Sequence, residues 1–242
     1  MSEGPSSNNF NKDNNKKIRS QITTKALTSS HKKTVSSPRA RKSQPRSHEI
    51  RKVLIDCATP LFSLYGFNAI SVRDIEIVAN MKRGVLIYHF KDKANFWRAV
   101  ADNLFNVIDT QRRIRMSVLK DVSKLEGVAM LIRFNVRLAS EHPEFARFLT
   151  QETKNPSWRL EYLVENHLKS ASKSLQKYVT SALNITNQEF AHWYYIMFTA
   201  SAGIFASGPE CALLFGIDSH QPDIVETHSK MLVALLMAPY KY

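Results

Sequence analysis

From residue 48 onward, apolar side chains recur with the spacing of an α-helix nearly everywhere, and no alternating strand pattern of useful length appears. The clearest example is residues 50–65, where apolar side chains fall at i, i+3, i+4, i+7, i+8, i+11, i+12 and i+15. They are Ile50, Val53, Leu54, Cys57, Ala58, Leu61, Phe62 and Tyr65. One face of a single helix carries all of these positions. The sequence therefore predicts an all-α fold.

The ends of this first helix also have sequence signals. Ser47 is a plausible N-cap, and Gly66 suits the position just after the last helical residue. Pro60 lies inside the segment and removes the amide that would bond to the Asp56 carbonyl. Because a proline in a helix interior costs about 3 kcal/mol, we expect a kink there.

Residues 71–90 predict two short helices joined by a tight turn. Ser71 is the expected N-cap of the first, Asn80 tolerates the left-handed backbone of the turn, and the second helix is expected from about Lys82 to Phe90. Helix-turn-helix modules lay such a second helix in the DNA major groove.

The candidate DNA-binding residues fall into two groups. Base edges are read from the N-terminus of the recognition helix, and phosphates by the basic, polar and aromatic side chains around it. Candidates for base edges are Lys82, Arg83 and Val85, and candidates for phosphates are Arg73, Tyr88, His89 and Lys93. On spacing alone, the solvated surface of a small helical bundle explains the pattern equally well.

Further helices are expected over the rest of the chain. One follows Asp92 to about Met116, and five or so more occupy residues 120–242. Their expected starts are Ser123, Pro143, Pro156, the capping box at Thr186, and Ile224. We expect the helix from Phe190 to end at Gly208-Pro209 and the last helix to end at Met237. The predicted domains are 48–108, which contains the helix-turn-helix, and 109–242.

The segment from Phe190 to Ala206 carries large and small apolar residues on more than one face. An ordinary core helix, a pocket wall and a homodimer interface all produce this pattern. The interface is our prediction, because the last helix supplies a matching apolar stripe. The candidate interface residues are Trp193, Met197, Phe198, Met231 and Leu235.

Residues 1–47 carry a formal charge of +9 out of +13 for the whole chain and contain few large apolar residues. Such a segment cannot bury enough apolar surface to fold, so it is predicted to be a disordered basic arm. The segment lacks the apolar stretch of a secretory signal peptide, so we do not expect it to be one. Its composition, rich in Arg and Ser and poor in acidic residues, also resembles that of a transit peptide. The two cysteines, Cys57 and Cys211, match no metal-ligand or redox spacing, which favours a reducing cytosol.

Sequence patterns of other chemistries are missing. The chain contains neither HExxH, GxSxG nor a glycine-rich phosphate loop, and its eight histidines form no cluster at metal-ligand spacing. No apolar stretch reaches the length of a membrane span. We therefore expect no enzyme, metal, cofactor or membrane partner.

The stretch from Ile50 to Ile108 resembles the DNA-binding domain of the tetracycline-repressor (TetR) family. The matching positions are Cys57-Ala58, Leu61-Phe62, Tyr65-Gly66-Phe67, Ser71-Val72-Arg73-Asp74-Ile75, Ala79, Arg83-Gly84, Leu86, Tyr88-His89-Phe90 and Asp92-Lys93. They stand in the family's order and spacing. The resemblance implies a helical C-terminal domain with a small-molecule pocket, which pairs through its last two helices as a four-helix bundle.

Four positions depart from the family pattern. Asn80 stands where the family has Gly, and Lys82 where it has a Ser or Thr that caps the recognition helix. Loss of that cap costs about 1 kcal/mol. Glu76 replaces a small residue, so its carboxylate must reach solvent or a partner. Ile87 replaces a Tyr that contacts phosphate.

Together these patterns predict a cytoplasmic, nucleoid-associated transcriptional repressor. Two copies would bind a pseudo-palindromic operator in double-stranded DNA, and an unidentified small-molecule effector would release them. Two alternatives stay open. Lys82, Glu76 and Ile87 suggest a ligand-binding protein whose DNA-binding domain has decayed. The basic arm suggests a general binder of nucleic acid or anionic membranes.

Overall fold

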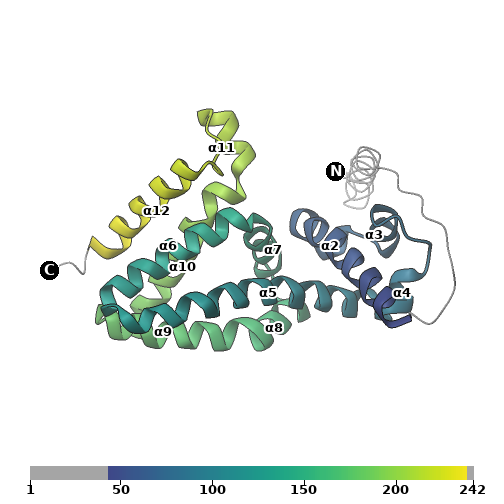
Figure 1. The fold of residues 1–242 in the computed structure, drawn as a ribbon, viewed down its shortest axis with the longest axis horizontal. Coiled ribbons are helices and arrows are strands. Elements are labelled where there is room, and N and C mark those ends of the chain that lie inside the picture. Colours follow the sequence, from purple (N-terminus) through teal and green to yellow (C-terminus); the bar gives the residue numbers. More distant parts are fainter. Residues whose placement is uncertain (1–42, 239–242) are drawn as a thin grey trace, which may run out of the picture. The chain divides into compact units, whose positions relative to one another are not determined.

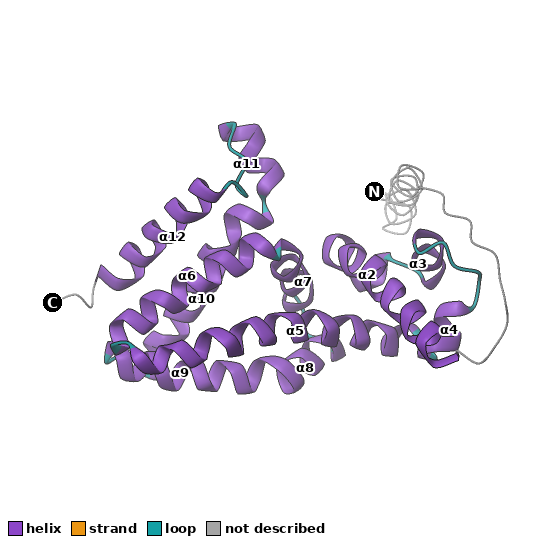
Figure 2. Ribbon diagram, in the orientation of Figure 1, coloured by secondary structure: helices purple, strands orange, loops and turns teal. Residues whose placement is uncertain are grey.

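The computed structural model describes residues 43–238, and these residues form helices joined by short loops (Figures 1 and 2). No strand occurs within that range, so the predicted all-α class is confirmed. Most of the predicted basic arm, residues 1–42, lies outside the described residues. The described residues divide into two compact units between Asn103 and Leu104.

The N-terminal unit contains four helices. They are α2 (Ser43–Ala69), α3 (Val72–Val78), α4 (Val85–Phe90) and the first part of α5 (Lys93–Val118). The division between the units lies inside α5, so this helix is the covalent connection between them. This helix follows Asp92 as expected, and Asp92 caps it, because the Asn95 amide donates to Asp92 Oδ1 at 2.6 Å.

Helix α2 differs from its prediction at its N-terminal end, whereas Gly66 interrupts the helix where the sequence places its end. It begins at Ser43, so Ser47 lies inside the helix and is not its N-cap. The backbone leaves helical φ/ψ values at Gly66, with φ of 76°, and not at Pro60. Pro60 keeps helical backbone angles, so the helix is not broken there, and the expected kink stays a prediction. Pro60 and Asp56 are both exposed, so water can satisfy the carbonyl that lacks an amide partner.

Aromatic side chains form the core of the N-terminal unit. Phe62, Phe96 and Trp97 are fully buried. The Phe96 ring lies 4.8 Å from that of Phe90 and 6.1 Å from that of Phe62, between ring centroids. Helices α2, α4 and α5 therefore share one packed centre, which fixes where α4 lies.

The C-terminal unit contains the rest of α5 and seven further α-helices. These are α6 (Lys124–Glu141), α7 (Pro143–Thr153), α8 (Trp158–Leu163), α9 (Lys169–Leu183), α10 (Asn187–Ala206), α11 (Gly208–Phe215) and α12 (Pro222–Met237). The predicted capping box at Thr186 is present, Ser123 starts α6 as expected and forms a capping box as well, and Pro143 occupies the first turn of α7. A π-helical segment, Val164–Leu168, joins α8 to α9.

Helix α11 is the element that the sequence analysis missed. Gly208-Pro209 was expected to end helical structure, but the chain bends by 67° after α10 and another helix begins there. Proline suits the first turn of a helix, where its missing amide is not needed. The same dipeptide therefore ends one helix and starts the next.

Helices α6, α9, α10 and α12 enclose the core of the C-terminal unit. Trp193 and Met197 of α10 lie inside this core and are buried, and Phe198 packs against it. The prediction that Trp193 and Met197 face a partner is therefore wrong. Helical periodicity marks them as apolar but cannot say which of two apolar faces points inward.

The capping box at Thr186 generates a stability prediction. Thr186 Oγ1 accepts a hydrogen bond from the Glu189 amide, and the Glu189 carboxylate accepts one from the Thr186 amide. The hydrogen bonds that the Thr186 amide and hydroxyl donate to this carboxylate lower the pKa of Glu189. We expect Thr186→Ala to lower the free energy of unfolding by about 1 kcal/mol, measured by urea denaturation followed by circular dichroism.

The matched control is Thr150→Ala on α7, because that exposed hydroxyl bonds only the Ala146 carbonyl of its own helix. We expect it to change stability by less than about 0.5 kcal/mol. A lowered carboxyl pKa stabilises the fold above the unfolded pKa, and this contribution disappears as the pH falls through the folded value. The difference between Thr186→Ala and the wild type should therefore shrink at acidic pH.

Candidate nucleic-acid interface

The first helix of the helix-turn-helix has a complete capping box. The Asp74 amide donates to Ser71 Oγ at 3.1 Å, and the Ser71 amide donates to Asp74 Oδ2 at 2.9 Å. At the other end, Asn80 adopts φ of 53°, and the Met81 amide donates to the Glu76 carbonyl at 2.8 Å. The predicted N-cap and the predicted left-handed turn are both confirmed.

The recognition helix α4 starts later than predicted. It begins at Val85, and its N-cap residue, Gly84, is left-handed with φ of 89°. Lys82 and Arg83 therefore lie in the turn before the helix and not in its first turn. Gly84 provides no side-chain cap, so the amides at the start of this helix need a partner from elsewhere.

Glu76 supplies that partner. Its Oε1 atom accepts a hydrogen bond from the Gly84 amide at 2.8 Å and another from the Leu86 amide at 3.2 Å. Arg73 lies close by, with NH1 3.7 Å from Oε2 of the same carboxylate. A carboxylate near a helix N-terminus also interacts favourably with the helix dipole. Helix α3 therefore caps helix α4 through one side chain.

Burial makes this contact important. The Glu76 residue is only 1% exposed, and a buried carboxylate without hydrogen bonds is strongly destabilising. Two backbone donors and a guanidinium satisfy it here. From the sequence, Glu76 is a polar group in need of a partner and Lys82 is a missing cap, but no local pattern connects the two positions.

The C-terminal end of α4 is held by α2. The Arg51 guanidinium donates to the His89 carbonyl at 2.6 Å and lies 4.1 Å from the centroid of the Phe90 ring. Ser47 Oγ lies 3.4 Å from His89 Nδ1. Sequence reasoning missed Arg51 and Ser47, because a helical pattern does not show which polar residues face a neighbouring element.

Lys93 has a similar position. Its ammonium group donates to the Phe67 carbonyl and lies 4.1 Å from the centroid of the Phe67 ring. In the structure, His89 and Lys93 therefore join helices of the N-terminal unit. Their predicted contact with phosphates stays a prediction.

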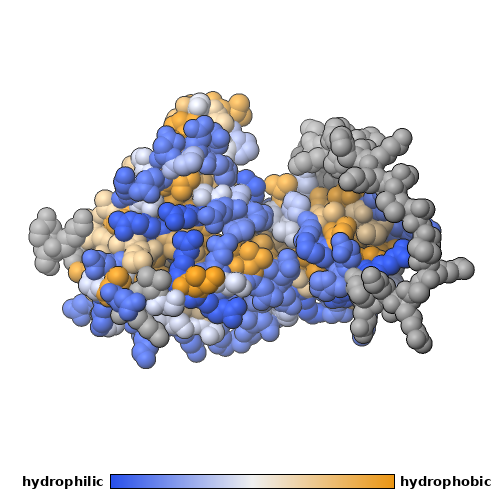
Figure 3. Space-filling view, in the orientation of Figure 1, coloured by the Kyte–Doolittle hydropathy of each residue, from blue (hydrophilic) through white to orange (hydrophobic). Residues whose placement is uncertain are grey.

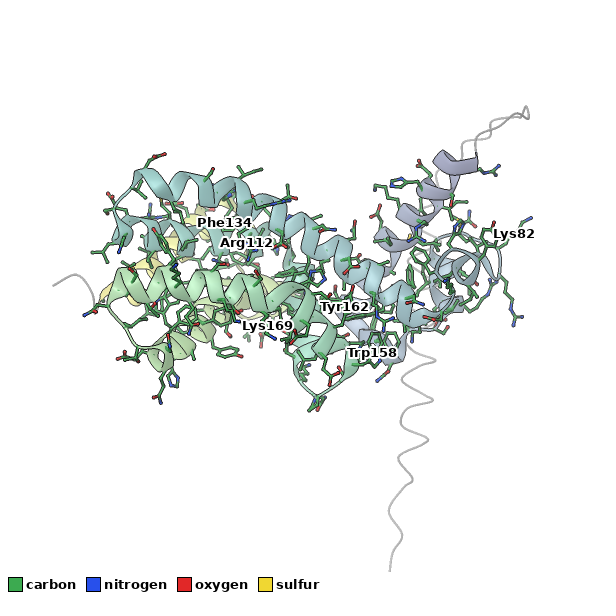
Figure 4. The ribbon with its side chains drawn as sticks, turned by 90° about the horizontal axis from the view of Figure 1, so that it is seen from below. Lys82, Arg112, Phe134, Trp158, Tyr162 and Lys169 are labelled. Carbon is green, nitrogen blue, oxygen red and sulfur yellow. The ribbon has the colours of Figure 1, made fainter. Side chains whose placement is uncertain are left out.

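The other predicted DNA-binding residues are open to solvent. Tyr88 is 85% exposed, Lys82, Arg83 and Arg73 are exposed, and Val85 is half-buried. Figure 4 shows Lys82 at the outer edge of the N-terminal unit. The turn and the first two turns of α4 thus present two cations and an aromatic hydroxyl on one short segment.

No group of three or more His, Cys, Asp or Glu side chains could hold a metal ion within residues 43–238. In the same range, no single helix is long and apolar enough to cross a membrane, although the bent pair α10 and α11 passes on length and composition together.

Removing the Glu76 cap should loosen the recognition helix. We expect Glu76→Ala to destabilise the N-terminal unit by about 1–3 kcal/mol, since it leaves two amides unpaired. Amide hydrogen exchange measured by NMR should accelerate at Gly84 and Leu86 in particular. Glu76→Gln keeps a carbonyl oxygen that can accept both bonds, so its effect should be smaller. Equal exchange at Leu86 in all three proteins would show that the carboxylate is not the cap.

Comparison with known proteins gives a family match that lies within this unit. The family model described as bacterial regulatory proteins, tetR family, matches residues 54–100. The HTH-type transcriptional regulator AcrR of Shigella flexneri is 34% identical over 61 residues, which are 25% of this chain and 28% of that protein. The match thus spans little more than a quarter of the length of this relative.

Solved structures match over more of the chain. A protein from Rhodococcus sp., described as a TetR-family transcriptional regulator, has a TM-score of 0.53 at 14% identity, over 80% of this chain and all of that one. A TetR-family transcriptional regulator from Pectobacterium atrosepticum has a TM-score of 0.44 at 18% identity, over 82% and 95% of the two chains. The first of these shows the shared fold. The family model covers the helix-turn-helix itself, so the N-terminal unit of this chain is similar to the DNA-binding domain of tetR-family regulatory proteins.

Proposed function

We propose that this protein is a transcriptional repressor that binds a pseudo-palindromic DNA operator as a homodimer and is released by a small-molecule effector. The observation that carries the proposal is the exposed segment of Lys82, Arg83 and Tyr88 on a turn and helix that Glu76 holds in place. In a dimer, two such helices enter successive major grooves. The site of action would be the chromosome in the cytoplasm.

Each exposed side chain suits a different contact. Arg83, just before the N-terminus of α4, can form a bidentate pair with a guanine edge. Lys82 adds a positive charge that attracts phosphate. Tyr88 lies a full turn further along α4, where its hydroxyl can donate to a phosphate oxygen. The capped helix counts against decay of the DNA-binding unit, because the departures at Glu76 and Lys82 compensate for each other.

The double variant Arg83→Ala, Tyr88→Ala tests this interface. We expect it to weaken binding to DNA from upstream of its own gene by about 1–3 kcal/mol for each base-edge pair that it removes, or roughly tenfold to a hundredfold. Gel shifts with scrambled competitor at two salt concentrations measure this. Arg113→Ala is the control, since Arg113 is an exposed arginine on α5 in the C-terminal unit.

A gel shift that the double variant does not weaken would support the alternative, in which the basic arm of residues 1–47 binds DNA. Binding that is indiscriminate, disappears at higher salt and survives the double variant would place the DNA contacts in residues 1–47, which carry a formal charge of +9. The helix-turn-helix would then describe the fold and not the function.

The proposal of a homodimer rests on exposed apolar side chains of α10, α11 and α12. A soluble monomer rarely exposes a large contiguous apolar patch. The most exposed large apolar residues on these helices are Leu213 (88%), Tyr195 (70%), Phe215 (70%), Met231 (67%) and Leu235 (65%). Figure 3 shows hydrophobic colouring at the tip formed by α11.

Helices α10 and α12 are apolar on two faces. Trp193 and Met197 of α10 and Leu232 of α12 lie in the protomer's own core. Met231 and Leu235 are one helical turn apart on a second, exposed face of α12 beside the one that Leu232 buries. We therefore keep Met231 and Leu235 as interface residues and replace Trp193 and Met197 of α10 by the exposed Tyr195. A second copy can cover these faces by two-fold symmetry, since an isologous interface uses the same patch twice.

Leu235→Glu tests the interface. We expect sedimentation velocity to show a monomer at concentrations where the wild type is a dimer, because a charge then lies in the interface core. Binding to the operator should weaken as well, since each protomer contacts one half-site. Leu125→Glu on α6 is the matched control, because Leu125 is exposed but lies on another helix. A Leu235→Glu dimer as stable as the wild type would exclude this face.

A further inference from the structure

An open groove of about 230 Å³ lies in the C-terminal unit between the end of α5 and helix α6. Leu119, Leu131 and Phe134 contribute apolar side chains to it, and Arg115, Arg133 and Arg137 contribute three guanidinium groups. Phe134 is labelled in Figure 4. The groove therefore combines apolar walls with a concentration of positive charge.

The three arginines have no anionic partner among the described residues. Within residues 43–238, none of the side chains that line the groove is acidic, and none of the three guanidinium groups forms an ion pair. Arg115 lies over the Phe134 ring, 4.8 Å from its centroid. By contrast, Arg112 on the same helix pairs with Asp109 at 3.0 Å. The neighbouring Arg112 is therefore neutralised by a carboxylate, whereas the three arginines that line the groove are not.

Their spacing adds to this imbalance. Arg133 and Arg137 are four residues apart, so they lie on the same face of α6, where like charges repel. Arg115 approaches from α5. A bound anion would relieve this repulsion, and planar guanidinium groups match the two oxygens of a carboxylate or a phosphate.

We propose that this groove binds a small oxyanion, a carboxylate or a phosphate ester, that carries a short apolar body, and that this ligand is the effector. The guanidinium groups hold the oxygens, and the apolar body lies against Leu119, Leu131 and Phe134. The volume sets the size class, because pockets for drug-sized ligands hold about 300–1,000 Å³ and this groove is smaller.

The position of the groove gives a route to the DNA-binding unit. Arg115 lies in the last turn of α5, the helix that connects the two units. Arg133 and Arg137 lie on α6, whose Val128, Ile132 and Val136 are fixed in the core. An anion bridging the two helices restrains the end of α5 against α6. This regulatory step rests on the proposed function, whereas binding in the groove does not.

Isothermal titration calorimetry of the full chain with octanoate and octyl phosphate tests binding. Acetate has the anion without the apolar body, octan-1-ol has the body without the charge, and octylammonium has the opposite charge. We expect octanoate or octyl phosphate to bind at least about tenfold more tightly than these three probes. The stronger of the two identifies the oxyanion. Equal binding of octan-1-ol or of acetate would overturn the proposal.

Variants locate the site. Arg137→Ala should weaken binding of the preferred probe about tenfold or more, and because Arg137 is exposed the fold should persist, which circular dichroism checks. Arg113→Ala is the matched control, since Arg113 lies on α5 near Arg115 but does not line the groove. Equal weakening in both variants would show a general charge effect and overturn the assignment.

Operator binding separates the two parts of the inference. The preferred probe should weaken the gel shift of the wild type and leave that of Arg137→Ala unchanged. A probe that binds the groove without changing the shift would overturn the effector role. If the wild type binds no operator at all, the proposed function fails and the effector role with it, while calorimetry still decides whether the groove holds the oxyanion.

Discussion

The recognition helix depends on a single buried carboxylate. Helix α4 has only six residues, far fewer than an isolated helix needs in water, so its conformation must come from tertiary contacts. Glu76 binds its first amides, Arg51 binds a carbonyl near its end, and Leu86 and Phe90 enter the core. Of these contacts, the one from Glu76 fixes the N-terminal end of α4, which is the end that the proposed function places towards DNA. The angle at which α4 is presented therefore depends on α3.

The same contact changes how the departures from the TetR pattern should be interpreted. A Lys at position 82 and a Glu at position 76 each look unfavourable when considered alone. In the structure, the acceptor that a Ser or Thr would provide comes from Glu76, through space and not through the adjacent chain. Lys82 then has no capping role and is exposed. With these two departures, the buried Glu76 caps α4 in place of a residue in the turn, and Lys82 adds a cation to the exposed surface of the turn.

Local signals made most of the fold predictable. Ser71, Ser123 and Thr186 cap helices as expected, because capping depends on residues only three positions apart. Failures occurred where tertiary structure decides. The start of α4 was misplaced because Gly84 takes a left-handed conformation that the sequence does not show. The candidate site was predicted as a set of exposed residues, but the contacts that hold His89 and Lys93 lie between elements distant in sequence.

The C-terminal unit shows the same limit in another form. Apolar periodicity in α10 and α12 cannot distinguish a protomer's core from a dimer interface, since both remove apolar surface from water. Only exposure separates Trp193 from Tyr195.

The groove could not be predicted from the sequence for a different reason, because its distinguishing property is a concentration of positive charge and not an apolar periodicity. Arg115 and Arg137 are ordinary surface arginines until the packing of α5 against α6 brings them to one groove. A ligand there alters DNA binding only by its difference in affinity between two states, and about 1.4 kcal/mol gives a tenfold change. Formation of one additional charge-assisted hydrogen bond in one state, worth about 1.5–3 kcal/mol, is sufficient for that.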